Sequence, residues 1–128
     1  MVWYLDTSAF LKLIVDEESS SAMRSWYTAN DQVWSSQLLY TEALRAAQRL
    51  QIDLQLVQEA LDTVTLILPS AATYTSAGRL EPHRLRSLDA LHLASAIEIG
   101  SDLDGIVVYD QRLADAARDT SIEVVSPS

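Results

Sequence analysis

Near its start the chain reads Val2-Trp3-Tyr4-Leu5-Asp6-Thr7-Ser8. Four consecutive apolar residues are typical of a strand that is buried on both faces, and the acid and hydroxyl residues that follow favour the start of a helix. Short apolar runs of the same kind recur along the chain. They give five expected strands: Val2–Leu5, Gln32–Ser35, Thr65–Leu68, Ile106–Tyr109 and Ile122–Val125.

Helical stretches separate these strands. The expected helices are Thr7–Val15, Ser20–Ala29, Leu38–Leu50, Leu54–Val64, Ala71–Leu80, Leu88–Ile99 and Gln111–Arg118. Because strands and helices alternate, the sequence predicts the α/β class, with a parallel sheet that carries helices on both faces. Ser36 and Ser87 are expected to cap the helices that follow them, and Gly100 to end the sixth helix. No repeat or linker divides the chain, so we expect one domain over residues 1–128.

Composition limits the function only partly. The chain has 128 residues, no cysteine and a formal net charge of −9. Without cysteine there are no disulfides, thiolate metal sites or cysteine nucleophiles, and a reducing cytoplasm is the expected location. Asp6 and Lys12 interrupt the apolar N-terminal stretch, so we expect neither a signal peptide nor a membrane-spanning helix. The net charge disfavours a broad basic surface for nucleic acid, but all basic residues except Lys12 are arginines, which suit phosphate recognition.

Two acids end expected strands. Asp6 follows Val2–Leu5, and Asp110 follows Ile106–Tyr109. Either acid alone is explained equally well by a helix cap. However, the carboxyl ends of parallel strands meet at one edge of a sheet, which is where ligands bind in folds of this class. Two carboxylates at that edge repel each other unless a cation lies between them, so their recurrence favours a metal site.

Two more acids lie on expected helices. Asp89 is in the first turn of a strongly apolar helix, where the helix dipole alone is a sufficient reason for an acid. Glu42 precedes Arg45 and Arg49 on one helix face. Its simpler interpretation is a surface salt bridge to Arg45, and its functional interpretation is an acid beside basic residues that guide phosphates. His92, one turn after Asp89, is expected to be a hydrogen-bonded core histidine outside the catalytic set.

Together the four acids predict a site for one or two hard divalent cations. Mg²⁺ and Mn²⁺ prefer oxygen ligands and use few protein carboxylates for each ion. In this interpretation Asp6 binds metal, and Ser8, with Thr7 as the less favoured alternative, donates a hydrogen bond to Asp6 or to a water on the ion as an outer partner.

Four longer stretches carry a more specific pattern: Leu5-Asp6-Thr7-Ser8-Ala9-Phe10-Leu11-Lys12, Thr41-Glu42-Ala43-Leu44-Arg45, Leu88-Asp89-Ala90-Leu91-His92-Leu93-Ala94-Ser95-Ala96 and Tyr109-Asp110-Gln111-Arg112-Leu113-Ala114-Asp115-Ala116-Ala117. They resemble the PIN-domain ribonucleases, and within them the VapC toxins of bacterial toxin–antitoxin pairs. The resemblance spans nearly the whole chain and fills all four acidic positions of the family pattern.

The resemblance implies a single PIN domain with five parallel strands in the order 3-2-1-4-5, Mg²⁺ or Mn²⁺ as cofactor, and endonucleolytic cleavage of RNA. It also implies a homodimer, a small VapB-like antitoxin as partner, and a structured RNA such as tRNA or rRNA as substrate. Asp6, Asp89 and Asp110 would hold a metal ion that lowers the pKa of an attacking water, and Glu42 would position that water or a second ion. Arg45 and Arg49 are the expected substrate-binding residues.

Rival interpretations fit less well. A phosphorylatable receiver domain needs an acid pair after the first strand and a late lysine, but Asp6 stands alone and Lys12 is the only lysine. A phosphohydrolase with an aspartyl nucleophile needs a second Asp where this chain has Ser8. The alternative that stays open is a PIN-fold interaction module that binds a partner or RNA without cleaving it.

Overall fold

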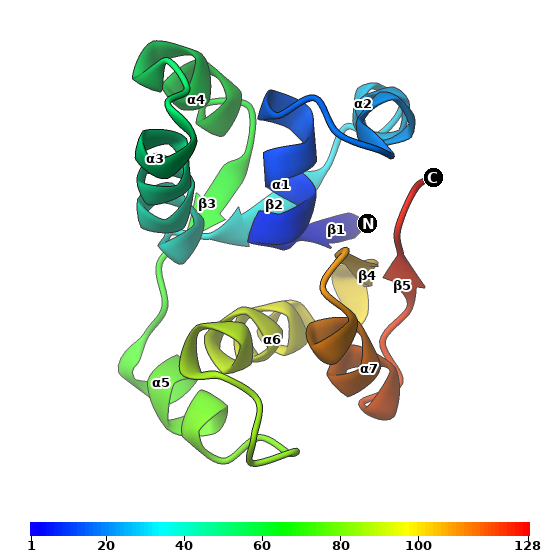
Figure 1. The fold of residues 1–128 in the computed structure, drawn as a ribbon. Helices are drawn as coiled ribbons and strands as arrows, with labels where there is room; N and C mark the ends of the chain where they lie inside the picture. Colours follow the sequence, from blue (N-terminus) through cyan, green and yellow to red (C-terminus); the bar gives the residue numbers. More distant parts are fainter.

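The sheet of this protein confirms the expected class and strand order. The computed structural model describes residues 1–128. Its strands are β1 (Val2–Leu5), β2 (Val33–Ser36), β3 (Thr65–Ile67), β4 (Leu103–Val107) and β5 (Val124–Val125). All neighbouring strands are parallel, and their order is β3-β2-β1-β4-β5. The strand that carries Asp6 at its end therefore lies in the middle of the sheet (Figure 1).

Helices cover both faces of this sheet, as Figure 1 shows. One face carries α1 (Thr7–Ile14), α2 (Ser20–Thr28), α3 (Leu38–Leu50) and α4 (Leu54–Leu61). The other carries α5 (Ala71–Gly78), α6 (Ser87–Ile99) and α7 (Gln111–Asp119), and a short 3₁₀ turn, Gly100–Asp102, leads from α6 into β4. None of these helices is long and apolar enough to cross a membrane.

The alternation of side chains along the strands divides the apolar core into two parts. Leu5 and Val107 point into the cluster beneath α1 and α3, where they meet Phe10 and Leu39. Tyr4 and Ile106, one residue earlier on each strand, point into the opposite cluster with side chains of α6 and α7. Both faces of β1 and β4 are therefore buried, which is why these strands have continuous apolar runs.

Several element boundaries differ from the sequence expectation. β4 begins at Leu103 and ends at Val107, not at Tyr109, because its register with β1 pairs Val107 with Leu5, the last residue of β1. The expected cap at Ser87 is wrong, because α6 already begins there and its capping residue, Arg86, makes no side-chain cap. Ser36 does accept a hydrogen bond from the Leu38 amide, and Gly100 ends α6 with a φ of 74°.

Candidate active site at the carboxyl end of the sheet

Asp6 is fixed at the point where β1 passes into α1. It is 4% exposed, and its Oδ2 accepts hydrogen bonds from the Ser8 amide at 3.1 Å and the Ser8 hydroxyl at 2.6 Å. The same Ser8 oxygen accepts a hydrogen bond from the Tyr109 amide at 2.9 Å. Ser8 therefore ties Asp6 to the segment that leaves β4, and Asp6 both caps α1 and lies at the middle of the carboxyl edge.

Asp89 and Asp110 lie on either side of one arginine. Asp110 caps α7 through Oδ1, which accepts hydrogen bonds from the amides of Arg112 and Leu113. Its Oδ2 lies 3.6 Å from Arg86 Nη2, and Asp89 Oδ2 lies 3.4 Å from Arg86 Nε. The Arg86 side chain is 67% exposed, so these contacts are weak surface pairs that solvent screens.

The three aspartates act on one another electrostatically. Burial, followed by the negative charges of Asp6 and Asp110, raises the pKa of Asp89 above its ordinary value, and Arg86 offsets only part of that rise. The side chains of Asp89 and Asp110 are 15% and 29% exposed, so solvent still reaches both. The sheet thus gathers like charges at an edge open to solvent, an arrangement that a bound cation would relieve.

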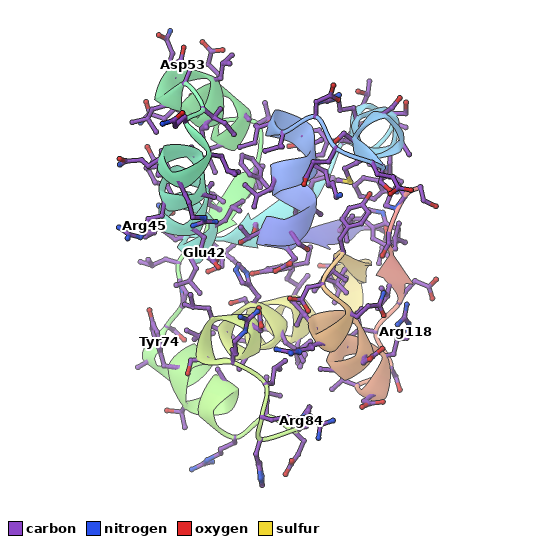
Figure 2. All side chains as sticks on the ribbon, in the orientation of Figure 1. Glu42, Arg45, Asp53, Tyr74, Arg84 and Arg118 are labelled. Carbon is purple, nitrogen blue, oxygen red and sulfur yellow. The ribbon has the colours of Figure 1, made fainter.

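Glu42 reaches this edge from α3, at the end of the helix that lies toward α6 (Figure 2). Its Oε1 accepts hydrogen bonds from the Thr7 hydroxyl at 2.9 Å and from His92 Nε2 at 2.6 Å. The surface salt bridge to Arg45 that would explain Glu42 in simpler terms is absent, because the carboxylate turns toward α1 and α6 instead.

His92 is completely buried, and both of its ring nitrogens have partners. Nδ1 lies 2.7 Å from the Tyr4 hydroxyl, and Nε2 lies 2.6 Å from Glu42 and 3.3 Å from Thr7. Burial lowers the pKa of His92, but the hydrogen bond to Glu42 and the charges of Asp6, Glu42 and Asp89 outweigh burial and raise that pKa overall.

The same contact shifts the carboxyl group in the opposite direction. Burial raises the pKa of Glu42, but the hydrogen bond and the positive charge of His92, helped by Thr7, outweigh burial and lower that pKa overall. Glu42 is therefore ionised, and an ionised carboxylate only accepts hydrogen bonds, so His92 Nε2 carries the shared proton.

The donor set suits a hard divalent cation in its chemistry. Asp6, Asp89, Asp110 and Glu42 offer oxygen atoms only, which are the ligands that Mg²⁺ and Mn²⁺ prefer. No three His, Asp or Glu side chains are grouped closely enough to form a ready-made metal site. Burial first, and then the negative charges of Asp6 and Asp110, raise the pKa of Asp89, and this repulsion among the three aspartates favours a cation between them.

Comparison with known proteins identifies the fold. A model of the PIN domain matches residues 3–119. The chain belongs to the PIN-domain family. It is 36% identical to a protein named Ribonuclease VapC46 from Mycobacterium tuberculosis, over 98% of this chain and 97% of that protein. It is 33% identical to Ribonuclease VapC47 from the same species, over 97% and 96% of the two chains. The expected membership of the VapC group is therefore confirmed.

A solved structure supports the same fold for this PIN domain. A chain in a structure described as a toxin–antitoxin complex from Klebsiella pneumoniae superposes with a TM-score of 0.75. The match covers 100% of this chain and 98% of that chain at 19% identity. At this identity the likeness establishes the architecture only.

The expected substrate-binding arginines of the PIN domain lie apart from the four acids. Arg45 and Arg49 line a surface cavity with Gln48 on α3, and both are exposed. Figure 2 shows Arg45 on the outer side of α3 and Glu42 at the end of that helix. Neither arginine takes part in an ion pair, so both guanidinium groups are available to an anionic ligand.

The structure adds Tyr4, His92 and Arg86 to the residues expected at the site of this PIN domain, and Thr7, the expected alternative to Ser8, donates its hydrogen bond to Glu42 and not to Asp6. Thr7, His92 and Tyr4 form a hydrogen-bonded group behind Glu42, and Arg86 joins Asp89 to Asp110. His92 does have its expected place in the core, but its partner is an acid of the site. The sequence spacing could have indicated Arg86 and His92, because Arg86 precedes Asp89 by three residues and His92 follows it by three, and residues three apart are neighbours on a helix.

Proposed function

We propose that this protein is a Mg²⁺- or Mn²⁺-dependent endoribonuclease that acts as the toxin of a toxin–antitoxin pair. The observation that carries the proposal is the convergence of Asp6, Asp89, Asp110 and Glu42 at the carboxyl edge of the sheet, with a raised pKa at Asp89. The names of its relatives, Ribonuclease VapC46 and Ribonuclease VapC47, supply the class of reaction.

Each acid has a distinct position in the proposed reaction. Asp6, Asp89 and Asp110 would hold the ion, which when bound supplies positive charge to polarise the scissile phosphate and to lower the pKa of an attacking water. Ser8 keeps Asp6 in its orientation through the hydroxyl hydrogen bond of 2.6 Å. Glu42 accepts two hydrogen bonds at Oε1 and none at Oε2, so Oε2 is free to orient that water.

The substrate in this proposal is a structured RNA, either tRNA or rRNA. Arg45 and Arg49 are unpaired and exposed on α3, the helix that carries Glu42, and they would bind phosphates of the strand. In a chain whose net charge is −9, the two arginines would supply local positive charge on the helix that carries Glu42. Thus RNA binding would depend on a few arginines rather than on the whole surface.

The proposal extends to the partners of the protein. We propose that a small VapB-like antitoxin silences the enzyme, and that the protein forms a homodimer in the cytoplasm. A solved structural neighbour is described as a toxin–antitoxin complex, which supports the antitoxin part of the proposal. Light scattering on the purified chain tests the dimer, since a monomer mass at micromolar concentration contradicts it.

The decisive experiment compares the wild type with Asp6→Asn. Both proteins, freed of any partner, are incubated with total tRNA and rRNA in Mg²⁺, in Mn²⁺ and in chelator. Asparagine is also a good helix cap, so this variant keeps the start of α1 while it removes the charge. We expect discrete fragments from the wild type with metal ions only, and none from the variant.

Two results contradict the proposal. Cleavage by a folded Asp6→Asn variant removes the assignment of Asp6, and intact RNA under every condition with folded wild type favours the interaction module that binds without cleaving. Circular dichroism spectra and unfolding curves of both proteins establish that they are folded.

A further inference from the structure

His92 lies behind the acids and has contacts that reach into the site. We propose that His92 is a positioning residue for the proposed RNA cleavage, which fixes Glu42 by Oε1 and leaves Oε2 free to orient the attacking water. This inference rests on the proposed function, and it assigns a role to a residue that the expected catalytic set leaves out. Thr7 and Tyr4 complete the arrangement.

The imidazole ring is fixed from two sides. Tyr4, on the central strand, contacts Nδ1 at 2.7 Å, and the two rings pack edge to face with centroids 5.8 Å apart. Glu42 contacts Nε2 at 2.6 Å. A rotated ring would lose both hydrogen bonds in a site with 0% exposure, where water cannot replace them. His92, held in place by Tyr4 of β1 and by its own helix α6, therefore holds the carboxylate of Glu42 in a fixed position.

Both hydrogen bonds that Glu42 accepts reach the same oxygen. Thr7 donates to Oε1 at 2.9 Å from α1, and His92 donates to Oε1 at 2.6 Å from α6. Donors on two different helices fix the position of Oε1 and, with the planarity of the carboxylate, restrict where Oε2 lies. The side chain of Glu42 is 23% exposed, so solvent reaches part of it, and Oε2 accepts no hydrogen bond from the protein.

Charge provides a second reason for a histidine at this position. His92 Nε2 lies 2.6 Å from the carboxylate of Glu42 at a position with 0% exposure. A buried ion pair is often no more stabilising than apolar side chains of the same size. If His92 served packing alone, an apolar side chain of similar size would be sufficient. Neither the proton on Nε2 nor the contact with Glu42 would then be needed.

The test uses three substitutions on α6. His92→Gln keeps an N–H donor within reach of Glu42 but no charge, and His92→Leu keeps apolar volume without a donor. Leu91→Ala is the matched control, because Leu91 lies on the same helix but packs against the separate apolar cluster of Ala77, Ala90 and Ala94. Steady-state cleavage gives kcat and KM for each protein, with unfolding curves measured in parallel.

We expect His92→Leu to lower kcat about 10–100-fold, the usual effect of removing an outer hydrogen-bonding partner, with little change in KM. His92→Gln should lower kcat less than about tenfold, since it restores the donor to Glu42. Leu91→Ala should leave kcat unchanged. Equal kcat for the wild type and His92→Leu overturns the inference, as does a loss in His92→Gln as large as that in His92→Leu.

A spectroscopic readout is independent of cleavage. In the metal-free protein the proton between Nε2 and Glu42 should give a far-downfield imidazole signal in the ¹H NMR spectrum, and Glu42→Gln should abolish it. If His92→Leu does not fold, the kinetics of His92→Gln and this signal still decide the question, because absence of the signal in wild type overturns the inference. A wild type that cleaves no RNA refutes the proposed function, and with it the role of His92, whatever the NMR spectrum shows.

Discussion

At the scale of single residues, Asp89 has the least favourable environment among the acids. Burial and the charges of Asp6 and Asp110 raise its pKa, so the ionised form present at neutral pH costs folding stability in the absence of a cation. Sites that gather like charges for function commonly lower stability in this way. The ion pair with the exposed Arg86 returns only a small part of that cost.

Removing the charge of Asp89 should stabilise the metal-free protein. We expect Asp89→Asn to raise the Tm in chelator at pH 7, on the order of 1–3 °C, because it relieves repulsion that solvent partly screens. Asp115→Asn is the control, since Asp115 is exposed and paired with Arg118. Mn²⁺ should then raise the Tm of the wild type more than that of Asp89→Asn. A lower Tm for Asp89→Asn in chelator would contradict the repulsion.

The contact between His92 and Glu42 predicts that folding stability decreases at both high and low pH. His92 has a raised pKa in the folded protein, so its contribution to stability is complete below its ordinary value of 6.5 and is lost as pH rises through the raised value. Glu42 has a lowered pKa, so its contribution is complete above its ordinary value of 4.5 and is lost as pH falls.

The free energy of unfolding that this pair contributes should therefore be largest between these two ordinary values. Urea unfolding of the wild type and of Glu42→Gln, measured from about pH 4 to pH 9, checks this prediction. We expect the difference between the two proteins to be largest near pH 5.5, between the ordinary values of 4.5 and 6.5, and to shrink on both sides. A difference that is constant with pH would show that the pair is not ionic.

At the scale of elements, Asp110 at the start of α7 combines a helix cap with the proposed role of a metal ligand. Asp110 caps the helix through Oδ1 and faces Arg86 through Oδ2. The two alternatives weighed from the sequence, a cap or a ligand, therefore do not exclude each other. Asp6 combines the two features in the same way at the start of α1.

Two substitutions separate these roles. Asp110→Ala should lower the free energy of unfolding by about 1 kcal/mol, whereas Asp110→Asn should change it little, because asparagine also caps helices well. Both variants should lose metal-dependent RNA cleavage, since neither carries the carboxylate. Chemical denaturation and the RNA assay measure the two effects on the same samples. An active Asp110→Asn variant would leave Asp110 as a cap alone.

The elements themselves were predictable because their signals are local. The bounds of β1 and α3 agree with the sequence expectation, since apolar runs and helical periodicity define both. The end of β4 was wrong by two residues, because its limit is set by pairing with β1, about a hundred positions away in the chain. The start of α6 was also misplaced, because the hydroxyl of Ser87 makes no cap.

At the scale of the whole molecule, the difference between local sequence signals and contacts of distant residues also decides how much of the site was predictable. Asp6 and Asp110 were predictable because they end strands, and the carboxyl edge of a parallel sheet is where ligands bind in this fold class. Asp89 was predictable because it is an acid in a strongly apolar helix. The hydrogen bond between Glu42 and His92 joins residues 50 positions apart. No periodicity in the sequence links α3 to α6, so that partner appears only once the two helices lie on opposite faces of the sheet.

In a chain of negative net charge, the two exposed arginines of α3 should determine how RNA binding responds to salt. In the Asp6→Asn background, Arg45→Gln with Arg49→Gln should weaken RNA binding and reduce the slope of log affinity against log salt by roughly 1–1.5, at about 0.7 for each lost phosphate contact. Arg118→Gln is the control, because Arg118 is on α7 and paired with Asp115. Equal slopes for all three proteins would remove Arg45 and Arg49 from the substrate path.

The central place of β1 in the sheet also has a consequence during synthesis. Asp6 leaves the ribosome early, but Asp110 and α7 lie on the far side of β1 from Glu42 and are made last among the four acids. At about 5–20 residues per second, on the order of several seconds separate Glu42 from Asp110. If the four acids form the proposed site, a nascent chain in that interval lacks part of it, so the proposed RNA cleavage would begin only when nearly all of the fold has been made.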